Sequence, residues 1–158
     1  MAREHRYAVE VEWTGNRGTG TSEYRAYGRE HVVTAPGKPA IPGSSDPAFR
    51  GDAARWNPEE LLVVALSQCH MLWYLHLAAE AGIAVQEYRD TAEGVMVEEA
   101  DGSGSFAAVL LKPRVTVAAG APQAKALSLH DLAHEKCFVA NSVNFPVMCD
   151  PGCIVASG

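Results

Sequence analysis

One stretch of the chain carries no formal charge over about five helical turns. From Leu61 to Ala79 there is no Asp, Glu, Lys or Arg. Asn57 and Pro58 precede this stretch, and these residue types cap a helix and occupy its first position, while Gly82 supplies a stop. The pattern predicts one long helix between Asn57 and Gly82.

A helix that is apolar all round must be buried on nearly every side. Its length also meets the requirement for a membrane span. However, Ser67, Gln68, His70 and His76 interrupt the apolar run, and no basic cluster flanks either end, so we expect a helix buried inside protein. Such burial needs more protein than one small chain easily supplies.

Alternating apolar and polar positions predict strands before this helix. Tyr7 to Trp13 alternates like a half-buried strand, a glycine-rich hairpin follows at 15–21, and residues 23–34 form one or two returning strands. Four prolines and several glycines between Ala35 and Trp56 argue against regular structure there. A loop this long in a compact domain is usually functional.

The second half of the chain continues with strands and one amphipathic helix. We expect strands at 85–97 and 106–118, a helical segment over 122–142, and a last strand at 145–156 that is broken at the Asp-Pro-Gly turn. This order predicts an α+β fold in which antiparallel sheets pack on a long central helix and a second helix. We expect a single domain over residues 1–158.

Composition and charge narrow the functional classes. The 158 residues are 47% hydrophobic and 20% charged, which is enough for a real core. The net charge is −6 and no cluster of Lys or Arg is present, so we expect neither nucleic acid nor a membrane surface as a partner. The start of the chain alternates instead of forming an apolar export signal, and the four cysteines then indicate reduced thiols in the cytoplasm.

Cys69 in the middle of the long helix is the first candidate for chemistry. It lies about 18 Å from the helix start, too far for the helix dipole to favour a thiolate. No Lys or Arg lies within two helical turns. A reactive Cys69 would therefore need a cation from a loop, and Arg17, Arg50 and Arg55 are the candidates. Without one, Cys69 is a packed small side chain.

The block Asn57-Pro58-Glu59-Glu60-Leu61-Leu62, followed by Ala65 and Cys69-His70, resembles the OsmC/Ohr family of thiol-dependent hydroperoxide reductases. The glycine-rich segment from Trp13 to Thr21 is similar to the first hairpin of that family. Cys137 falls on the second predicted helix, where the family keeps its second cysteine. The residues before Cys137, His-Glu-Lys, depart from the Cys-Pro start seen elsewhere in the family, which leaves the subfamily open.

The resemblance implies a two-cysteine peroxidase without a cofactor or metal ion. Cys69 would attack an organic hydroperoxide and become a sulfenic acid, and Cys137 would resolve it as a disulfide. An external dithiol, of the lipoyl type for some members, would reduce the disulfide. Arg50 and Arg17 match the family arginine that holds the thiolate, with Arg50 ranked first, and Glu59 matches the glutamate that pairs with it.

Helix geometry adds an expectation about assembly. Glu59 and Cys69 are about 15 Å apart along one helix, so one arginine cannot bridge both within a subunit. If these residues form one set, the arginine and Glu59 come from the partner chain. The helix that is apolar all round also favours a homodimer. The resemblance implies the same assembly, because the family forms intertwined homodimers with sites at the interface.

Two other functional classes stay open. His130 and His134 have i, i+4 spacing, and Cys149 and Cys153 could add thiolates to a zinc site; the two cysteines could instead form an accessory disulfide. Alternatively, the protein is a non-catalytic binder with an apolar pocket. Four residues favour such a pocket in either an enzyme or a binder: Leu66, Leu72, Trp73 and Phe138.

Overall fold

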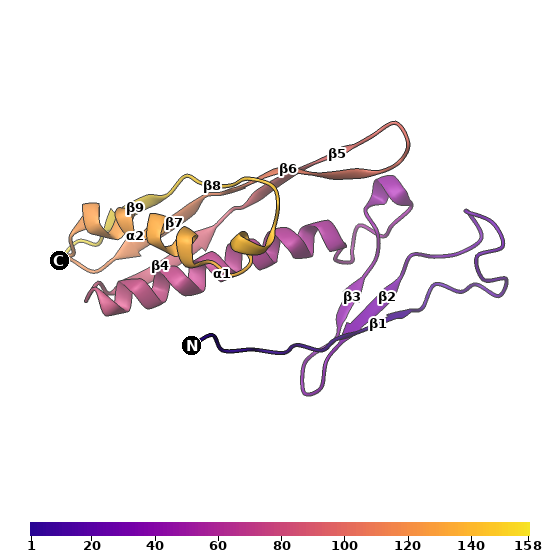
Figure 1. Cartoon of the computed structure of the whole chain (residues 1–158), viewed down its shortest axis with the longest axis horizontal. Helices are drawn as coiled ribbons and strands as arrows, with labels where there is room; N and C mark the ends of the chain where they lie inside the picture. The colour runs from indigo at the N-terminus through magenta and orange to yellow at the C-terminus, as the bar shows by residue number, and fades with distance from the viewer. The chain divides into compact units, whose positions relative to one another are not determined.

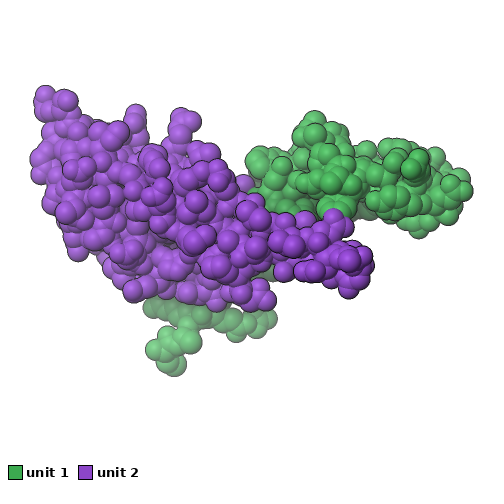
Figure 2. Space-filling view, turned by 90° about the horizontal axis from the view of Figure 1, so that it is seen from above, with its two compact units in different colours: residues 1–61 green, residues 62–158 purple.

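The computed structural model describes all residues from 1 to 158. The chain divides into two compact units, residues 1–61 and 62–158 (Figure 2). The first unit holds one sheet, and the second holds two sheets and the second helix (Figure 1). The long helix begins in the first unit and continues through the second.

The first unit is built on a three-stranded antiparallel sheet in the order β1-β2-β3. Its strands are β1 (Glu10–Trp13), β2 (His31–Thr34) and β3 (Ile41–Gly43). The returning strand predicted within 23–34 is thus confirmed in its last part. The first strand is shorter than predicted and exposed along its whole length instead of half-buried.

The segment between β2 and the long helix has more structure than its prolines suggested. It contains β3 and the short 3-10 helix η1 (Pro47–Phe49), so the prediction of no regular structure is wrong. Pro42 fits because β3 is an edge strand, where a missing N–H group leaves no ladder bond unmade. Ser44 is fully buried, and its hydroxyl accepts a hydrogen bond from the Asp52 N–H group at 3.0 Å.

The long helix α1 (Pro58–Glu80) has the ends that its sequence predicts. The Glu60 N–H group donates to Asn57 Oδ1 at 2.8 Å, and the Asn57 N–H group donates to the Glu60 carboxylate at 3.3 Å, which is a capping box. Gly82 takes a left-handed conformation with φ of 71°, and the N–H group after it donates back to the Ala78 carbonyl at 2.9 Å. This bond and the glycine form a Schellman-type stop.

The second unit holds six strands in two three-stranded sheets, β4-β7-β9 and β5-β6-β8. Their bounds are β4 (Val85–Asp90), β5 (Glu93–Glu98), β6 (Gly104–Leu111), β7 (Pro113–Val117), β8 (Val147–Cys149) and β9 (Gly152–Val155). The helix α2 (Gln123–Lys136) and the 3-10 helix η2 (Ala140–Ser142) lie between β7 and β8 along the chain. The break predicted in the last strand is confirmed, because β8 and β9 belong to different sheets.

Two sequence predictions about these strands are wrong. Residues 106–118 are not one strand, because the chain leaves one sheet at Leu111 and enters the other at Pro113. The sheets are also not purely antiparallel: β8 runs parallel to β6, and β9 runs parallel to β7. The chain reaches β8 and β9 only after crossing over through α2, and such a crossover brings strands back in parallel.

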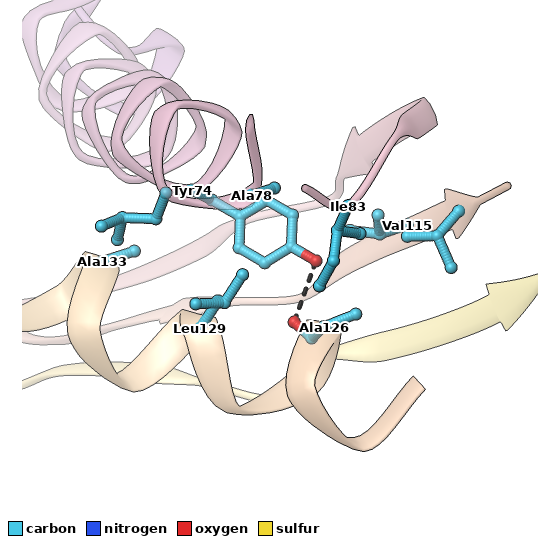
Figure 3. Packing of buried hydrophobic residues seen from close by; sticks show 9 residues of the cluster. Tyr74, Ala78, Ile83, Val115, Ala126, Leu129 and Ala133 are labelled. Carbon is cyan, nitrogen blue, oxygen red and sulfur yellow. Dashed lines mark hydrogen bonds between the residues drawn. The ribbon is translucent and has the colours of Figure 1, made fainter. Parts of the chain in front are cut away.

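The main core of the second unit lies between α1, α2 and the sheet β4-β7-β9 (Figure 3). The Tyr74 ring is fully buried there, and its hydroxyl donates to the Ala126 carbonyl at 2.9 Å, so its one polar atom is satisfied. A second, smaller core cluster forms around Leu66, Val109 and Leu111. The buried members of the main cluster are Tyr74, Leu77, Ala78, Ile83, Val115, Val117, Ala126, Leu129 and Ala133.

In a single chain, α1 buries one face only. The buried residues follow helical spacing and are Leu66, His70, Tyr74, Leu77 and Ala78. Leu72 keeps 60% of its surface exposed and Val64 keeps 38%, so the predicted burial on nearly every side is not met within one chain. By length and composition α1 could also cross a membrane, but core helices of soluble proteins meet the same criterion.

Candidate active site

Cys69 and Cys137 come from different helices of the second unit. Cys69 lies on α1 at the edge of the buried face and is half-buried. Cys137 is buried and caps the C-terminus of α2, where its N–H group donates to the His134 carbonyl at 3.3 Å. The helix predicted over 122–142 therefore ends earlier than expected, and Cys137 follows its last residue.

The Cys69 thiol lies close enough to Cys137 to raise the pKa of the Cys137 thiol, although 68 positions separate the two residues in the sequence. Burial raises the pKa of Cys137 to about 11. The Ala140 N–H group, 3.5 Å from the Cys137 sulfur, acts in the opposite direction and lowers the pKa. Hydrogen bonding with the Cys69 thiol raises it further. Cys137 is thus a protonated thiol at neutral pH.

A shallow apolar hollow of about 260 Å³ is lined by Leu72, Trp73, His76 and Phe138. Leu72 and Trp73 follow Cys69 by one helical turn, and Phe138 follows Cys137 directly. Three of the four residues that favoured an apolar pocket therefore line the hollow. The fourth, Leu66, does not: it is fully buried in the smaller core cluster.

The hollow has aromatic walls and a basic residue at its side. The Trp73 and Phe138 rings meet at 70° with their centroids 5.5 Å apart. The Lys136 ammonium lies 5.9 Å from the centroid of the Trp73 ring, within the range of a cation–π contact. Sequence reasoning missed His76 and Lys136. Both stand within a turn of residues that it did select, so helical spacing from Trp73 and Cys137 would have found them.

A larger hollow of about 690 Å³ lies over the sheet β4-β7-β9. Its walls include Cys153 and Arg114 but neither Cys69 nor Cys137. Volume alone would make it the first candidate for a binding site. Neither cysteine lines the smaller hollow, but three of its four walls follow Cys69 or Cys137 within one helical turn along the chain, and we place the site there for that reason.

The three charged residues implied by the family resemblance lie in the first unit. Arg17 is exposed and pairs with Glu30 at 3.7 Å. Arg50 directly follows η1, is exposed, forms no ion pair, and has a φ of 65°. Glu59, in the first turn of α1, has one carboxylate oxygen that is buried without a hydrogen-bond partner. Their pairing with Cys69 stays a prediction.

The zinc site suggested by His130 and His134 is not formed. His130 is buried and His134 is exposed, so the two side chains do not face one space. Cys149 and Cys153 are both free thiols on strands of different sheets, so the suggested accessory disulfide is not formed either. His130 instead contacts His70, with 3.0 Å between His130 Nδ1 and His70 Nε2.

This histidine pair is neutral at pH 7. Burial lowers the pKa of His70 to about 4, although Asp90 opposes the shift. Burial also lowers the pKa of His130 to about 4, and His70 lowers it further. No local pattern in the sequence indicates this contact, because 60 positions separate the two rings.

Comparison with known proteins agrees with this architecture. The sequence profile of the OsmC-like protein family matches residues 51–150, which is more than half of the chain. The structure of an OsmC-like protein of unknown function from Vibrio cholerae is 32% identical, with a TM-score of 0.85, and the match covers 94% of this chain and 99% of that one. No curated protein sequence matches the chain significantly.

Two more distant structures share the fold. An organic hydroperoxide resistance protein OsmC from Legionella pneumophila is 19% identical with a TM-score of 0.66, covering 95% of this chain and 98% of its own. An organic hydroperoxide resistance protein from Elizabethkingia anophelis is 16% identical with a TM-score of 0.64, covering 98% of this chain and all of its own. The profile match and the 32% identical relative establish that this chain belongs to the OsmC-like protein family.

Proposed function

We propose that this protein reduces organic hydroperoxides to alcohols, with Cys69 as the peroxidatic and Cys137 as the resolving cysteine. The observation that carries the proposal is that the Cys69 thiol lies close enough to Cys137 to raise its pKa, while residues that follow the two cysteines along the chain line an apolar hollow. The half-buried Cys69 is accessible to a substrate, whereas the buried, protonated Cys137 is not suited to react first. The OsmC-like family includes hydroperoxide reductases, which agrees with this division of roles.

The proposed reduction of a hydroperoxide takes three steps. The Cys69 thiolate attacks the terminal oxygen of ROOH, the O–O bond breaks, and the leaving alkoxide takes a proton to become ROH. The Cys137 thiol then condenses with the Cys69 sulfenic acid, forming the disulfide and releasing water. An external dithiol reduces this disulfide by exchange and is itself oxidised. The net reaction converts a hydroperoxide and a dithiol into an alcohol, water and a disulfide.

Apolar walls suit the organic part of the substrate. Leu72, Trp73 and Phe138, which follow the cysteines within one helical turn along the chain, present hydrocarbon and aromatic surface. Hydrogen peroxide would gain nothing from this surface, whereas an alkyl or aryl group removes apolar area from water at about 25 cal/mol per Å². We therefore propose organic hydroperoxides as the substrate class. All four cysteines are free, which fits a reducing compartment such as the cytoplasm.

Thiol counting with one equivalent of cumene hydroperoxide tests the proposal. Two of the four free thiols should disappear together, and peptide mass spectrometry should find Cys69 linked to Cys137. The Cys153→Ser variant is the matched control and should lose the same pair. No thiol loss, or a disulfide that contains Cys149, would contradict the two-cysteine mechanism and would favour a protein that only binds apolar ligands.

We also propose that the active form is a homodimer in which Arg50 and Glu59 serve the cysteine pair of the partner chain. The exposed side of α1, with Leu72 and Val64, is apolar surface that a second copy could bury. The buried, unpartnered carboxylate oxygen of Glu59 would be satisfied by a guanidinium group. Both observations support an assembly larger than one chain.

Light scattering at micromolar protein tests the assembly. We expect twice the 16.9 kDa mass of one chain. The Val64→Glu variant, which changes a residue that is 38% exposed in a single chain, should keep its helix content and shift the mass toward the monomer. A wild-type protein that stays monomeric at micromolar concentration would exclude the dimer.

A further inference from the structure

Three side chains with metal-binding atoms converge in the second unit, and neither Cys69 nor Cys137 is one of them. His70 comes from α1, His130 from α2 and Cys149 from β8. His70 Nε2 lies 3.0 Å from His130 Nδ1 and 3.9 Å from the Cys149 sulfur. All three ligand atoms lie within 4.8 Å of one another, although the residues are spread over 80 positions of the sequence.

The two imidazoles are costly groups to keep in this core. His70 is 1% exposed and His130 is 2% exposed. They contact each other through one nitrogen each, while His70 Nδ1 and His130 Nε2 are buried without a hydrogen-bond partner. A buried polar group without a hydrogen-bond partner destabilises the folded state. Packing alone would be served better by leucine, so the pair calls for a role beyond packing.

The electrostatic potential at the Cys149 sulfur is negative. Burial raises the pKa of Cys149 to about 12, and the nearby carboxylates of Asp90, Asp131 and Asp150 raise it further, with only Arg114 acting in the opposite direction. The same carboxylates that disfavour a bare thiolate favour a cation beside it. Two neutral imidazoles and one thiol near several carboxylates are the kinds of group that bind a borderline-soft divalent metal ion.

We propose that His70, His130 and Cys149 form a binding site for a zinc-class divalent cation. With Zn–N distances of about 2.0–2.1 Å and a Zn–S distance of about 2.3 Å, tetrahedral geometry requires roughly 3.4 Å between nitrogens and 3.6 Å from nitrogen to sulfur. The observed separations of 3.0 Å and 3.9 Å differ from these values by a few tenths of an ångström. The third pair, His130 Nδ1 and the Cys149 sulfur, lies within 4.8 Å. Metal binding therefore requires the side chains to rotate, so that the direct contact between the two imidazole nitrogens opens and Cys149 approaches His130, and a water molecule can take the fourth position.

Binding must release a proton. The zinc ion replaces the hydrogen of the Cys149 thiol, so a Zn–S bond forms, an S–H bond breaks, and one proton passes to the solvent. The bound ion and thiolate then carry one net positive charge between them. The carboxylates of Asp90, Asp131 and Asp150 offset that charge, and no electron transfer takes place.

Zinc titration of dialysed protein, with Zn²⁺ alone as the probe, tests the site. We expect one equivalent bound per chain with release of one proton, and at least tenfold weaker binding in Cys149→Ser. The Cys153→Ser variant is the matched control, because it removes a neighbouring cysteine outside the cluster, and it should bind like the wild type. Co²⁺ in place of zinc should give a thiolate-to-cobalt charge-transfer band that Cys149→Ser abolishes.

A double variant, Cys69→Ser with Cys137→Ser, separates this site from the cysteine pair. It should keep full zinc affinity, since neither residue belongs to the cluster. Circular dichroism of Cys149→Ser, with helix content unchanged, would show that lost binding does not reflect unfolding. Wild-type affinity no higher than that of Cys149→Ser, or zinc lost with the Cys69 and Cys137 substitutions, would overturn the proposal.

Discussion

Replacing Cys69 by serine is expected to lower kcat/KM for an organic hydroperoxide by at least about a thousandfold, because a hydroxyl group is not ionised near neutral pH and is a weak nucleophile. The substitution changes one atom in a half-buried side chain, so the fold should be retained. Hydroperoxide consumption with excess dithiothreitol measures the effect. The proposed mechanism gives no other thiol this role, since Cys137 is buried and protonated.

The Cys137→Ser variant should behave differently from Cys69→Ser. It still forms the sulfenic acid on Cys69, which dimedone can trap, and it should complete one stoichiometric turnover without forming the intramolecular disulfide. Cys153→Ser should keep wild-type turnover. If Cys69→Ser reduced hydroperoxide as fast as the wild type, the cysteine pair would not be catalytic, and a protein that only binds apolar ligands would be the better explanation.

Local chemistry explains why the long helix could be predicted from the sequence. Its start depends on hydrogen bonds between Asn57 and Glu60, three residues apart, and its end depends on the left-handed Gly82. Both signals lie within one turn of the helix end that they define. The parallel pairing of β8 and β9 has no such local signal, because the partner of a strand is chosen by tertiary packing.

The cysteine pair shows what resemblance to a family adds to physical reasoning. Helical spacing placed Cys69 on α1 and Cys137 near α2, but only the family resemblance indicated that the two act together. In the structure the Cys69 thiol lies close enough to Cys137 to raise the pKa of the Cys137 thiol. Of the four residues expected to favour an apolar pocket, Leu72, Trp73 and Phe138 line the hollow. Leu66 does not, because it lies on the core face of α1.

The histidines of α2 show where spacing misleads. An i, i+4 pair differs by about 40° around a helix, and at the edge of a buried face this is enough to separate a core residue from an exposed one. His130 lies with Ala126, Leu129 and Ala133 on the buried face of α2, whereas His134 lies outside it. The true neighbour of His130 is His70 on the other helix, a contact that no periodicity within α2 could reveal.

The second large effect is expected at Arg50. Replacing Arg50 by glycine should lower kcat/KM by about a hundredfold, comparable to the loss of one electrostatic stabiliser in other enzymes, while the free energy of unfolding changes by no more than about 1 kcal/mol. Arg50 is exposed without an ion pair and has a φ of 65°, a conformation that costs a non-glycine residue roughly 1–2 kcal/mol. Glycine relieves this cost, and its greater freedom in the unfolded chain offsets the gain.

A strained backbone whose side chain forms no ion pair is typical of a functional position, and this makes a substitution of Arg50 informative. If its guanidinium stabilises the Cys69 thiolate, the pH–rate profile of Arg50→Gly should shift to higher pH, and part of the activity should return in alkaline buffer. Arg25→Ala, which removes another exposed loop arginine, should leave the profile unchanged. Arg17→Ala should have a smaller effect than Arg50→Gly, because Arg17 already pairs with Glu30. The opposite result, in which Arg17→Ala shifts the profile and Arg50→Gly does not, would assign the thiolate-stabilising charge to Arg17.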